Sequence, residues 1–161
     1  MLEDRDMEVA LDKWIDTTDS AGKNVLSYFY QDMEKYCYMF QSYAFITRIQ
    51  QLDQLDMTKD IIFIERSIFS DRNIFAKTCH ETNLLSDIEW ITYNTWFNNM
   101  KPKYQTIFDN SFFIYLQVSP NTALERINKR SRTEENKIEL SYLQLLHQKH
   151  EEWLNTQSKN I

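Results

Sequence analysis

Glu65 and Arg66 follow directly on a short apolar run, Ile61 to Ile64. A β-branched and aromatic run without alternation predicts a strand that is buried on both faces, as in a parallel sheet. Ligands of open α/β sheets bind at the carboxyl ends of such strands. A glutamate there can accept a proton or hold Mg²⁺ through water, and an arginine can donate two hydrogen bonds to a phosphate or hydroxyl oxygen. The pair is a candidate catalytic site, and the alternative is a charged pair that simply ends a strand in solvent.

A second group consists of three closely spaced arginines, Arg126, Arg130 and Arg132. Arg126 and Arg130 are one helical turn apart and share a face of the predicted helix. In an acidic protein such a group is suited to close over a polyphosphate. A solvated helix end is the alternative interpretation, because positive side chains are favoured at helix C-termini.

The third group combines aromatic rings with polar side chains. Two aromatic rings can sandwich a flat base, and Gln41 offers both a donor and an acceptor to the edge of a base. Arg48 and Asp71 can pair with each other, which would direct the carboxylate at an amino group. The alternative is an aromatic core with polar residues at its surface. The members of this group are Tyr30, Phe40, Gln41, Arg48, Asp71 and Phe75.

Composition narrows the classes of function. The chain has 161 residues, 42% of them hydrophobic, and a formal net charge of -6. These values suit one domain with its own core and argue against a nucleic-acid-binding surface. No apolar run approaches the ~20 residues that span a bilayer, and the acidic start of the sequence lacks a signal-peptide core. We expect no nucleic-acid partner, no membrane contact and a cytoplasmic location, with a mitochondrial or virus-infected-cell setting as alternatives.

The rarer residue types add little chemistry of their own. Cys37 and Cys79 are too few and too far apart in sequence for a disulfide framework or a zinc site, so packing roles are expected. His147 and His150 are three residues apart on a predicted helix and suggest surface or packing roles rather than a metal site. Gly22 is the only glycine, where average usage of ~7% would give about eleven.

The order of predicted elements indicates an α/β fold. Besides the run that ends at Glu65, a second apolar run, Ser111 to Val118, predicts another strand. Strand, helices, strand and helix is α/β organisation, with helices covering a parallel sheet. Two strands alone make a poor sheet, so the sheet is expected to be incomplete. Helical periodicity covers 24–36, 40–55, 70–79, 84–100, 122–129 and 140–154.

The three groups, in this order, resemble the deoxynucleoside kinase family, which includes deoxycytidine, deoxyguanosine and mitochondrial thymidine kinases. The combination of Glu65-Arg66-Ser67, Asp71 and the arginine group is specific. The resemblance implies a P-loop kinase-like parallel sheet with flanking helices, truncated to few strands and mostly helical. It implies one domain over 1–161 that is incomplete at both ends. The similarity covers about residues 8 to 154, and the matching stretches are 24–30, 40–44, 65–75, 115–120, 126–135, 142–143 and 146–154.

Carried over position by position, the resemblance implies ATP-dependent 5′-phosphorylation of a deoxynucleoside with Mg²⁺. Glu65 would act at the metal and proton-transfer site, and Arg66 would hold the 5′-hydroxyl and the arriving phosphoryl group. The sugar 3′-hydroxyl would be bound by Tyr30 and Glu135. The base would be contacted by Phe40, Gln41, Asp71 and Phe75. The ATP phosphates would be covered by Arg126, Arg130 and Arg132.

One detail narrows the base. The predicted base pocket combines Ala44, Arg48 and Asp71. In the family, the Arg–Asp combination accompanies deoxycytidine and purine deoxynucleosides, whereas relatives that accept thymidine lack it. A carboxylate accepts from an exocyclic amino group, which thymine does not have. The resemblance therefore implies a preference for deoxycytidine, deoxyadenosine or deoxyguanosine over thymidine.

The sequence also departs from the family. The family's Gly-x4-Gly-Lys-Ser/Thr loop, whose N–H groups cradle the donor phosphates, is not found in these residues, and Ala21-Gly22-Lys23-Asn24 does not replace it. The family's usual catalytic base precedes a tryptophan by five residues, whereas Glu8 precedes Trp14 by six. Glu8 is a candidate base if one residue is inserted between them.

These departures leave alternatives to an active kinase. The chain is then a fragment of a normal kinase, or a catalytically inactive paralogue that binds nucleoside or dimerises with an intact kinase. A third interpretation is a protein that acts by binding another protein. It is suggested by Trp90, Trp96 and Phe97 in the stretch from Leu84 to Met100. Helices of this region form a dimer interface in the family, so a homodimer is expected, although a core role explains the same aromatic residues.

Overall fold

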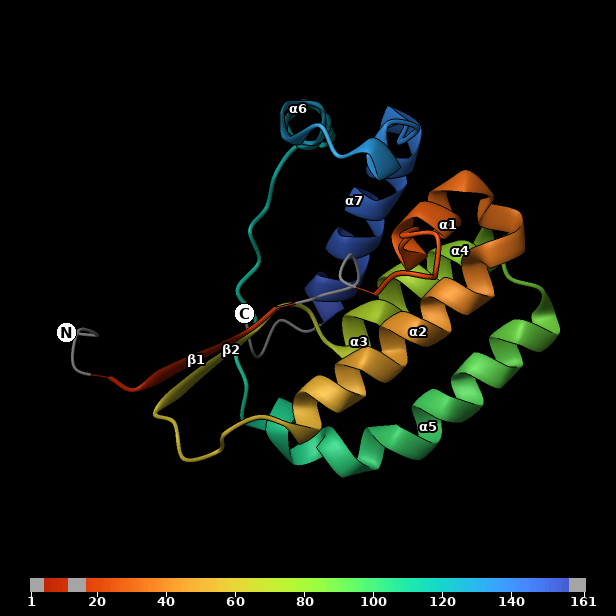
Figure 1. Cartoon of the computed structure of the whole chain (residues 1–161). Helices are drawn as coiled ribbons and strands as arrows, with labels where there is room; N and C mark the ends of the chain where they lie inside the picture. Colours follow the sequence, from red (N-terminus) through yellow and green to blue (C-terminus); the bar gives the residue numbers. More distant parts are fainter. Residues whose placement is uncertain (1–4, 12–16, 157–161) are drawn as a thin grey trace.

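The computed structural model describes residues 5–11 and 17–156. Within these ranges a small parallel sheet lies beside a larger body of helices (Figure 1). The strands β1 (Met7–Ala10) and β2 (Ile61–Ile64) pair in parallel. Their register runs from Met7 opposite Ile61 to Ala10 opposite Ile64, so the carboxyl ends of both strands lie together.

The strand predicted over Ile61 to Ile64 is confirmed, but its expected burial on both faces is wrong. Phe63 is 41% exposed, and its neighbour Val9 on β1 is 61% exposed. A sheet of two strands offers too little cover for an apolar strand, whereas wider parallel sheets carry helices on both faces. The sheet is therefore incomplete among the described residues, as the sequence indicates.

Helices make up most of the described chain. The long helices are α2 (Met33–Asp53), α5 (Asp87–Asp109) and α7 (Leu140–Thr156). The shorter helical elements are α1 (Val25–Gln31), α3 (Ile68–Ser70), η2 (Asp71–Ala76), α4 (Lys77–Glu81), α6 (Pro120–Arg130) and η3 (Thr133–Glu135). Among the described helices, none combines the length and apolar character that a membrane-spanning helix requires.

The helix expected over 24–36 is interrupted at Asp32. The backbone of Asp32 is not helical (φ -154°, ψ 87°), and its side chain accepts a hydrogen bond from Lys35 N at 3.1 Å. Such a side-chain cap starts a new helix, so α1 and α2 are separate and the helix expected over 40–55 becomes the second part of α2. The helices predicted over 122–129 and 140–154 are confirmed as α6 and α7.

The strand expected over Ser111 to Val118 is wrong. These residues lie in an extended connection from α5 to α6 that joins no sheet in the described structure (Figure 1). Phe112, Ile114 and Leu116 alternate along it and are 84%, 71% and 82% exposed. The composition suits a strand, but a strand also needs a neighbouring backbone for its hydrogen bonds.

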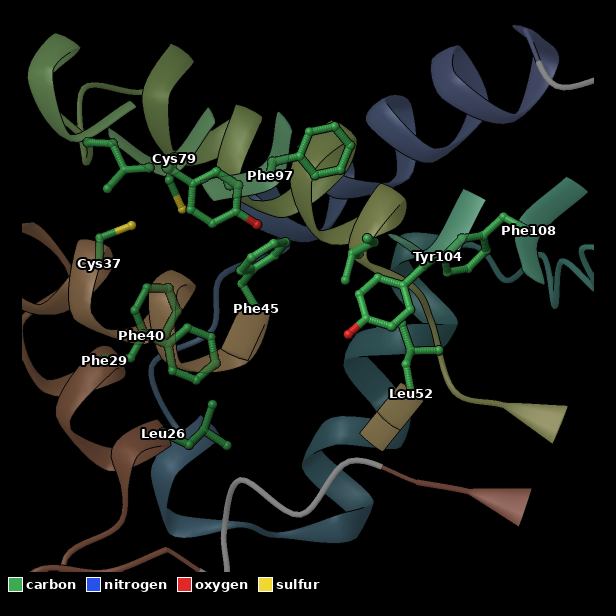
Figure 2. Packing of buried hydrophobic residues seen from close by; sticks show 14 residues of the cluster. Leu26, Phe29, Cys37, Phe40, Phe45, Leu52, Cys79, Phe97, Tyr104 and Phe108 are labelled. Carbon is green, nitrogen blue, oxygen red and sulfur yellow. The ribbon is translucent and has the colours of Figure 1, made fainter. Parts of the chain in front are cut away.

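Aromatic rings from α1, α2 and α5 build the core (Figure 2). Phe29 stacks on Phe40 at a centroid distance of 4.6 Å, and Phe45 meets Tyr93 edge-on at 5.6 Å. Burying a side chain of this size stabilises the fold by about 1.5–3 kcal/mol. The core thus fixes α2 and α5 against the short helical segments that come directly after β2. Those short segments carry part of the candidate site.

Candidate functional site

The chain turns from β2 into helix at Glu65, Arg66 and Ser67. Glu65 N donates to Ala10 O at 3.0 Å and ends the strand pair. Arg66 then adopts a left-handed conformation (φ 61°), which costs a non-glycine residue about 1–2 kcal/mol. Ser67 begins α3 with a capping box, because its Oγ accepts from Ser70 N at 3.1 Å and its N–H donates to Ser70 Oγ at 2.8 Å. The turn leaves Glu65 and Arg66 exposed at the carboxyl end of β2.

Arg48 and Asp71 form the buried ion pair expected from the sequence. Their residues are 1% and 2% exposed, and Arg48 Nε donates to Asp71 Oδ2. Arg48 Nη1 also donates to the carbonyl oxygen of Glu65. Burial raises the pKa of the Asp71 carboxyl, and the adjacent Arg48 guanidinium opposes that rise. One guanidinium therefore connects the buried Asp71 carboxylate to the strand end.

The helix predicted over 70–79 contains a π-helical stretch, η2, that periodicity does not predict. At its end Lys77 N donates to Arg72 O, one residue further back than in an α-helix. Such widened turns are frequent at functional sites. The stretch packs on α2 and on α7, and it carries Asp71 and Phe75.

Phe75 lies beneath Arg66. The guanidinium carbon of Arg66 is 4.3 Å from the centroid of the Phe75 ring. The other expected base-packing residue, Phe40, is 6% exposed and stacks on Phe29. The structure thus gives each ring a protein partner, and their contact with a base stays a prediction.

Gln41 is buried beside the two cysteines. It is 3% exposed, and its Nε2 donates to Cys79 Sγ at 3.5 Å. A hydrogen bond with Cys79, together with burial, raises the pKa of the Cys37 thiol. Both cysteines are fully packed and free, as expected, and Cys79 orients the Gln41 amide in a way that spacing alone does not reveal.

Glu135 gathers two of the three arginines. It is 7% exposed and accepts from Arg130 Nη2 at 2.6 Å and from Arg130 Nε at 3.2 Å. Arg132 Nη1 lies 3.5 Å from its other oxygen. Tyr30 is close enough that the Glu135 charge, after burial, helps to raise the pKa of Tyr30 to about 12. The two predicted sugar-binding residues are therefore brought together, while Arg126 is exposed on α6.

A contact that sequence reasoning missed joins this region to α1. Asn24 caps α1, since its Oδ1 accepts from Ser27 N at 2.8 Å. Its Nδ2 donates to Glu134 Oε1 at 2.8 Å, across 110 residues of sequence. The cap is visible in the sequence as an asparagine before a helical stripe, but its long-range partner is not.

Glu8 is placed away from Glu65. It lies opposite Ile62 in the strand pair, and its carboxylate accepts from Asp56 N at 2.9 Å, ahead of β2. Three residues from Ile62 to Glu65 correspond to about 10 Å of extended chain. Trp14 lies outside the described residues. The structure does not bring Glu8 to the exposed pair at the strand end, and its catalytic role stays a prediction.

Glu65 is the carboxylate at the strand end that could contact a metal ion. Within the described part of the chain, no group of three or more His, Cys, Asp or Glu side chains could hold a metal. Mg²⁺ commonly keeps several waters and binds through one or two carboxylates and substrate phosphates. An exposed Glu65 beside Arg66 fits that mode of binding.

Arg48 links the buried Arg–Asp pair to the strand end, and Tyr30 lies close enough to sense the charges of Glu135, Arg66 and Arg130. A sequence model described as "Deoxynucleoside kinase" matches residues 3–160. The chain belongs to the deoxynucleoside kinase family. The expected resemblance is thereby confirmed, and the mostly helical structure with two parallel strands is consistent with a truncated form of that fold.

Individual relatives agree with the family assignment. The chain is 40% identical to deoxycytidine kinase of Mus musculus over 144 residues, which cover 86% of this chain and 55% of that protein. It is 39% identical over 140 residues to the probable deoxycytidine kinase of Fowlpox virus, covering 86% and 59%. It is 33% identical over 144 residues to the mitochondrial deoxyguanosine kinase of Xenopus laevis, covering 86% and 54%. The chain therefore spans little more than half the length of these relatives.

Proposed function

We propose that these residues bind a deoxynucleoside and present its 5′-hydroxyl for phosphorylation by ATP. The observation that carries the proposal is the buried Arg48–Asp71 pair and its link to the Glu65 carbonyl oxygen. Burying a charged pair costs desolvation free energy. This pair lies directly beside the exposed Glu65 and Arg66. Perturbed carboxyls and charge partners of this kind cluster at functional sites.

The pair also defines the class of base. Asp71 accepts hydrogen bonds, and Arg48 holds the carboxylate in place through its Nε. Cytosine and adenine present an amino group where thymine presents a carbonyl oxygen, and guanine carries its amino group at N2, whereas thymine has none. A buried acceptor that meets a carbonyl oxygen is left unpaired, which costs about 1–3 kcal/mol. The proposed substrates are therefore deoxycytidine and purine deoxynucleosides, in preference to thymidine.

The other groups take the remaining parts of the substrate. Tyr30 and Glu135 bind the 3′-hydroxyl, supported by their proximity. Gln41 reads the base edge, and Phe40 and Phe75 pack beside it. Arg66 holds the 5′-oxygen, and Glu65 accepts its proton or holds Mg²⁺ through water.

Phosphoryl transfer needs charge stabilisation more than covalent chemistry. Arg126, Arg130 and Arg132 are the proposed contacts to the ATP phosphates. Mg²⁺, when bound, would neutralise charge between the phosphates. In the described structure Glu135 pairs with two of these arginines, Arg130 and Arg132. To contact ATP, these guanidinium groups would have to bind the phosphates in addition to Glu135 or in its place.

A second function is favoured by two observations. The 161 residues contain one glycine, which lies in a turn at φ 76° rather than in a phosphate loop. Helix α5 exposes Ile88, Ile91 and Trp96 by 68%, 59% and 53%. We propose as the alternative that these residues alone bind nucleoside and pair through α5 as a homodimer or with an intact kinase, without turning over ATP.

Calorimetry with deoxycytidine, deoxyadenosine, deoxyguanosine and thymidine tests the binding proposal, and an ATP-dependent assay with deoxycytidine tests catalysis. Binding with turnover supports the kinase. Binding without turnover supports the alternative. Absence of binding to all four nucleosides contradicts both.

A further inference from the structure

The Arg66 side chain rests on a ring whose own position is set from a distant helix. Arg66 is exposed, and holding so long a side chain in one direction costs conformational entropy. Its guanidinium carbon lies 4.3 Å from the Phe75 centroid, a cation–π distance. The Phe75 ring is therefore one of the contacts that orient Arg66.

Phe75 is in turn packed against His150 of α7. The two ring centroids are 5.8 Å apart at an interplanar angle of 83°, the edge-to-face arrangement that aromatic rings prefer. His150 also contacts Tyr115, whose ring stacks on it at a centroid distance of 6.0 Å and an interplanar angle of 5°. Phe75, His150 and Tyr115 thus form a ring stack that begins under Arg66.

Hydrogen bonds hold the middle ring and the far ring of the stack. His150 Nδ1 lies 2.7 Å from the Leu146 carbonyl oxygen; because a carbonyl only accepts, that nitrogen carries the hydrogen. Tyr115 OH donates to Glu151 Oε1 at 3.0 Å, and Gln117 Nε2 donates to the same oxygen at 2.7 Å. The His150 ring therefore has a fixed plane and a fixed tautomer.

The neutral form of His150 is favoured near Arg66. Burial lowers the pKa of His150, and the nearby positive charges of Arg66 and His147 lower it further, against the opposing effects of Leu146 and Glu151. The neutral imidazole does not repel the guanidinium. The neutral His150 ring thus packs against Phe75 without electrostatic repulsion of the Arg66 guanidinium.

We propose that His150 is a positioning residue that fixes the Phe75 ring and, through it, the direction of the Arg66 guanidinium. The inference rests on the proposed function, in which Arg66 meets the 5′ end of the nucleoside. His150 acts through Phe75 and contacts no substrate. A residue that only filled space would support the fold without controlling where Arg66 points.

The first measurement reads Arg66 directly and needs no ligand. In the full chain, the Nε–Hε resonance of Arg66, assigned with Arg66→Lys, is expected to be shielded by the Phe75 ring. His150→Ala should move it toward the position of a free arginine. His150→Phe, which keeps an aromatic ring, should restore it, and His147→Ala, on the same helix but outside the ring stack, should leave it unchanged.

The second measurement compares deoxycytidine 5′-monophosphate with deoxycytidine. His150→Ala is expected to reduce the affinity gained from the 5′-phosphate about threefold, the size of one lost cation–π contact, and to reduce deoxycytidine affinity by less, because Arg66 meets only a neutral hydroxyl there. An unshifted Arg66 resonance, or equal losses for both ligands, overturns the inference. If His150→Ala does not fold, Tyr115→Leu removes the far ring and the same outcomes apply. If neither ligand binds the wild-type chain, the proposed function fails, while the Arg66 resonance still decides whether His150 positions that side chain.

Discussion

Arg48, from the middle of α2, donates a hydrogen bond to the carbonyl oxygen of Glu65 at the end of β2. The same guanidinium binds the Asp71 carboxylate. One side chain thus holds the proposed base-reading carboxylate and the backbone of the residue that is proposed to take the proton. A substitution that moves Asp71 should therefore also move the backbone at Glu65, and the reverse.

Replacing Arg48 should be costly because it leaves Asp71 buried without its partner. We expect Arg48→Ala to lower the free energy of unfolding by about 3–5 kcal/mol, measured by urea denaturation. Arg5→Ala is the matched control. Its ion pair with Asp60 spans 3.8 Å between side chains that are 58% and 47% exposed, and such pairs contribute about 1 kcal/mol at most. Equal losses in the two variants would show that the buried pair does not hold the site.

The turn at Ser67 should depend on its capping box. Ser67→Ala removes the oxygen that accepts from Ser70 N and should lower the free energy of unfolding by about 1 kcal/mol. Ser141→Ala, at an exposed serine near the start of α7, should change it by less than about 0.5 kcal/mol. A Ser67→Ala protein as stable as wild type would mean that the strand-to-helix turn is fixed by other contacts.

Stability should fall at mildly acidic pH through His150. Burial lowers the pKa of His150 in the folded chain, whereas the unfolded value is about 6.5. The folded state therefore favours the neutral ring, and this contribution is present above about pH 6.5 and is lost as the pH falls below it. The charged or polar groups that face the ring are Arg66, His147, Glu151 and Tyr115.

The pH effect is isolated by comparing wild type with His150→Phe, which cannot titrate. The free energy of unfolding of wild type, relative to the variant, should decline between about pH 7.5 and pH 5. A difference that stays constant over this interval contradicts a lowered pKa for His150.

Releasing the arginines from Glu135 should weaken sugar binding. Glu135→Gln keeps the shape of the side chain but removes the charge that holds Arg130 and Arg132. We expect deoxycytidine affinity to fall about tenfold, the cost of one charge-assisted hydrogen bond. Glu139→Gln, an exposed neighbour on the same segment, is the control and should bind as wild type does. An unchanged affinity in Glu135→Gln would remove Glu135 from the sugar site.

Local patterns in the sequence predicted much of the fold. Helix α6 follows from Ser119 and Pro120 at its start, and α7 follows from its apolar period, because both signals lie within the helix itself. The break at Asp32 also has a local cause, an Asp cap, but it competes with a continuous apolar stripe. The run from Ser111 to Val118 could not be assigned correctly, because pairing depends on a second strand and not on the residues of the first.

The same distinction applies to the site. Glu65, Arg66 and the Arg48–Asp71 pair could be predicted because their residue types suggest their chemistry. The ring stack from Phe75 to His150 joins residues 75 positions apart, and nothing in a helical period at either end indicates the other. The placement of Phe75 under Arg66 depends on the π-helical turn of η2, which leaves no signature in apolar spacing.

The central claim is that Asp71, held by Arg48, recognises an amino group on the base. Deoxycytidine and deoxyuridine differ only at position 4 of the base and in the hydrogen on the adjacent N3, so calorimetric titration of the full chain with each tests recognition of this edge. We expect deoxycytidine to bind at least about tenfold more tightly than deoxyuridine, because the carbonyl oxygen of uracil would leave the buried Asp71 carboxylate unpaired. Equal affinity for the two nucleosides would contradict the claim.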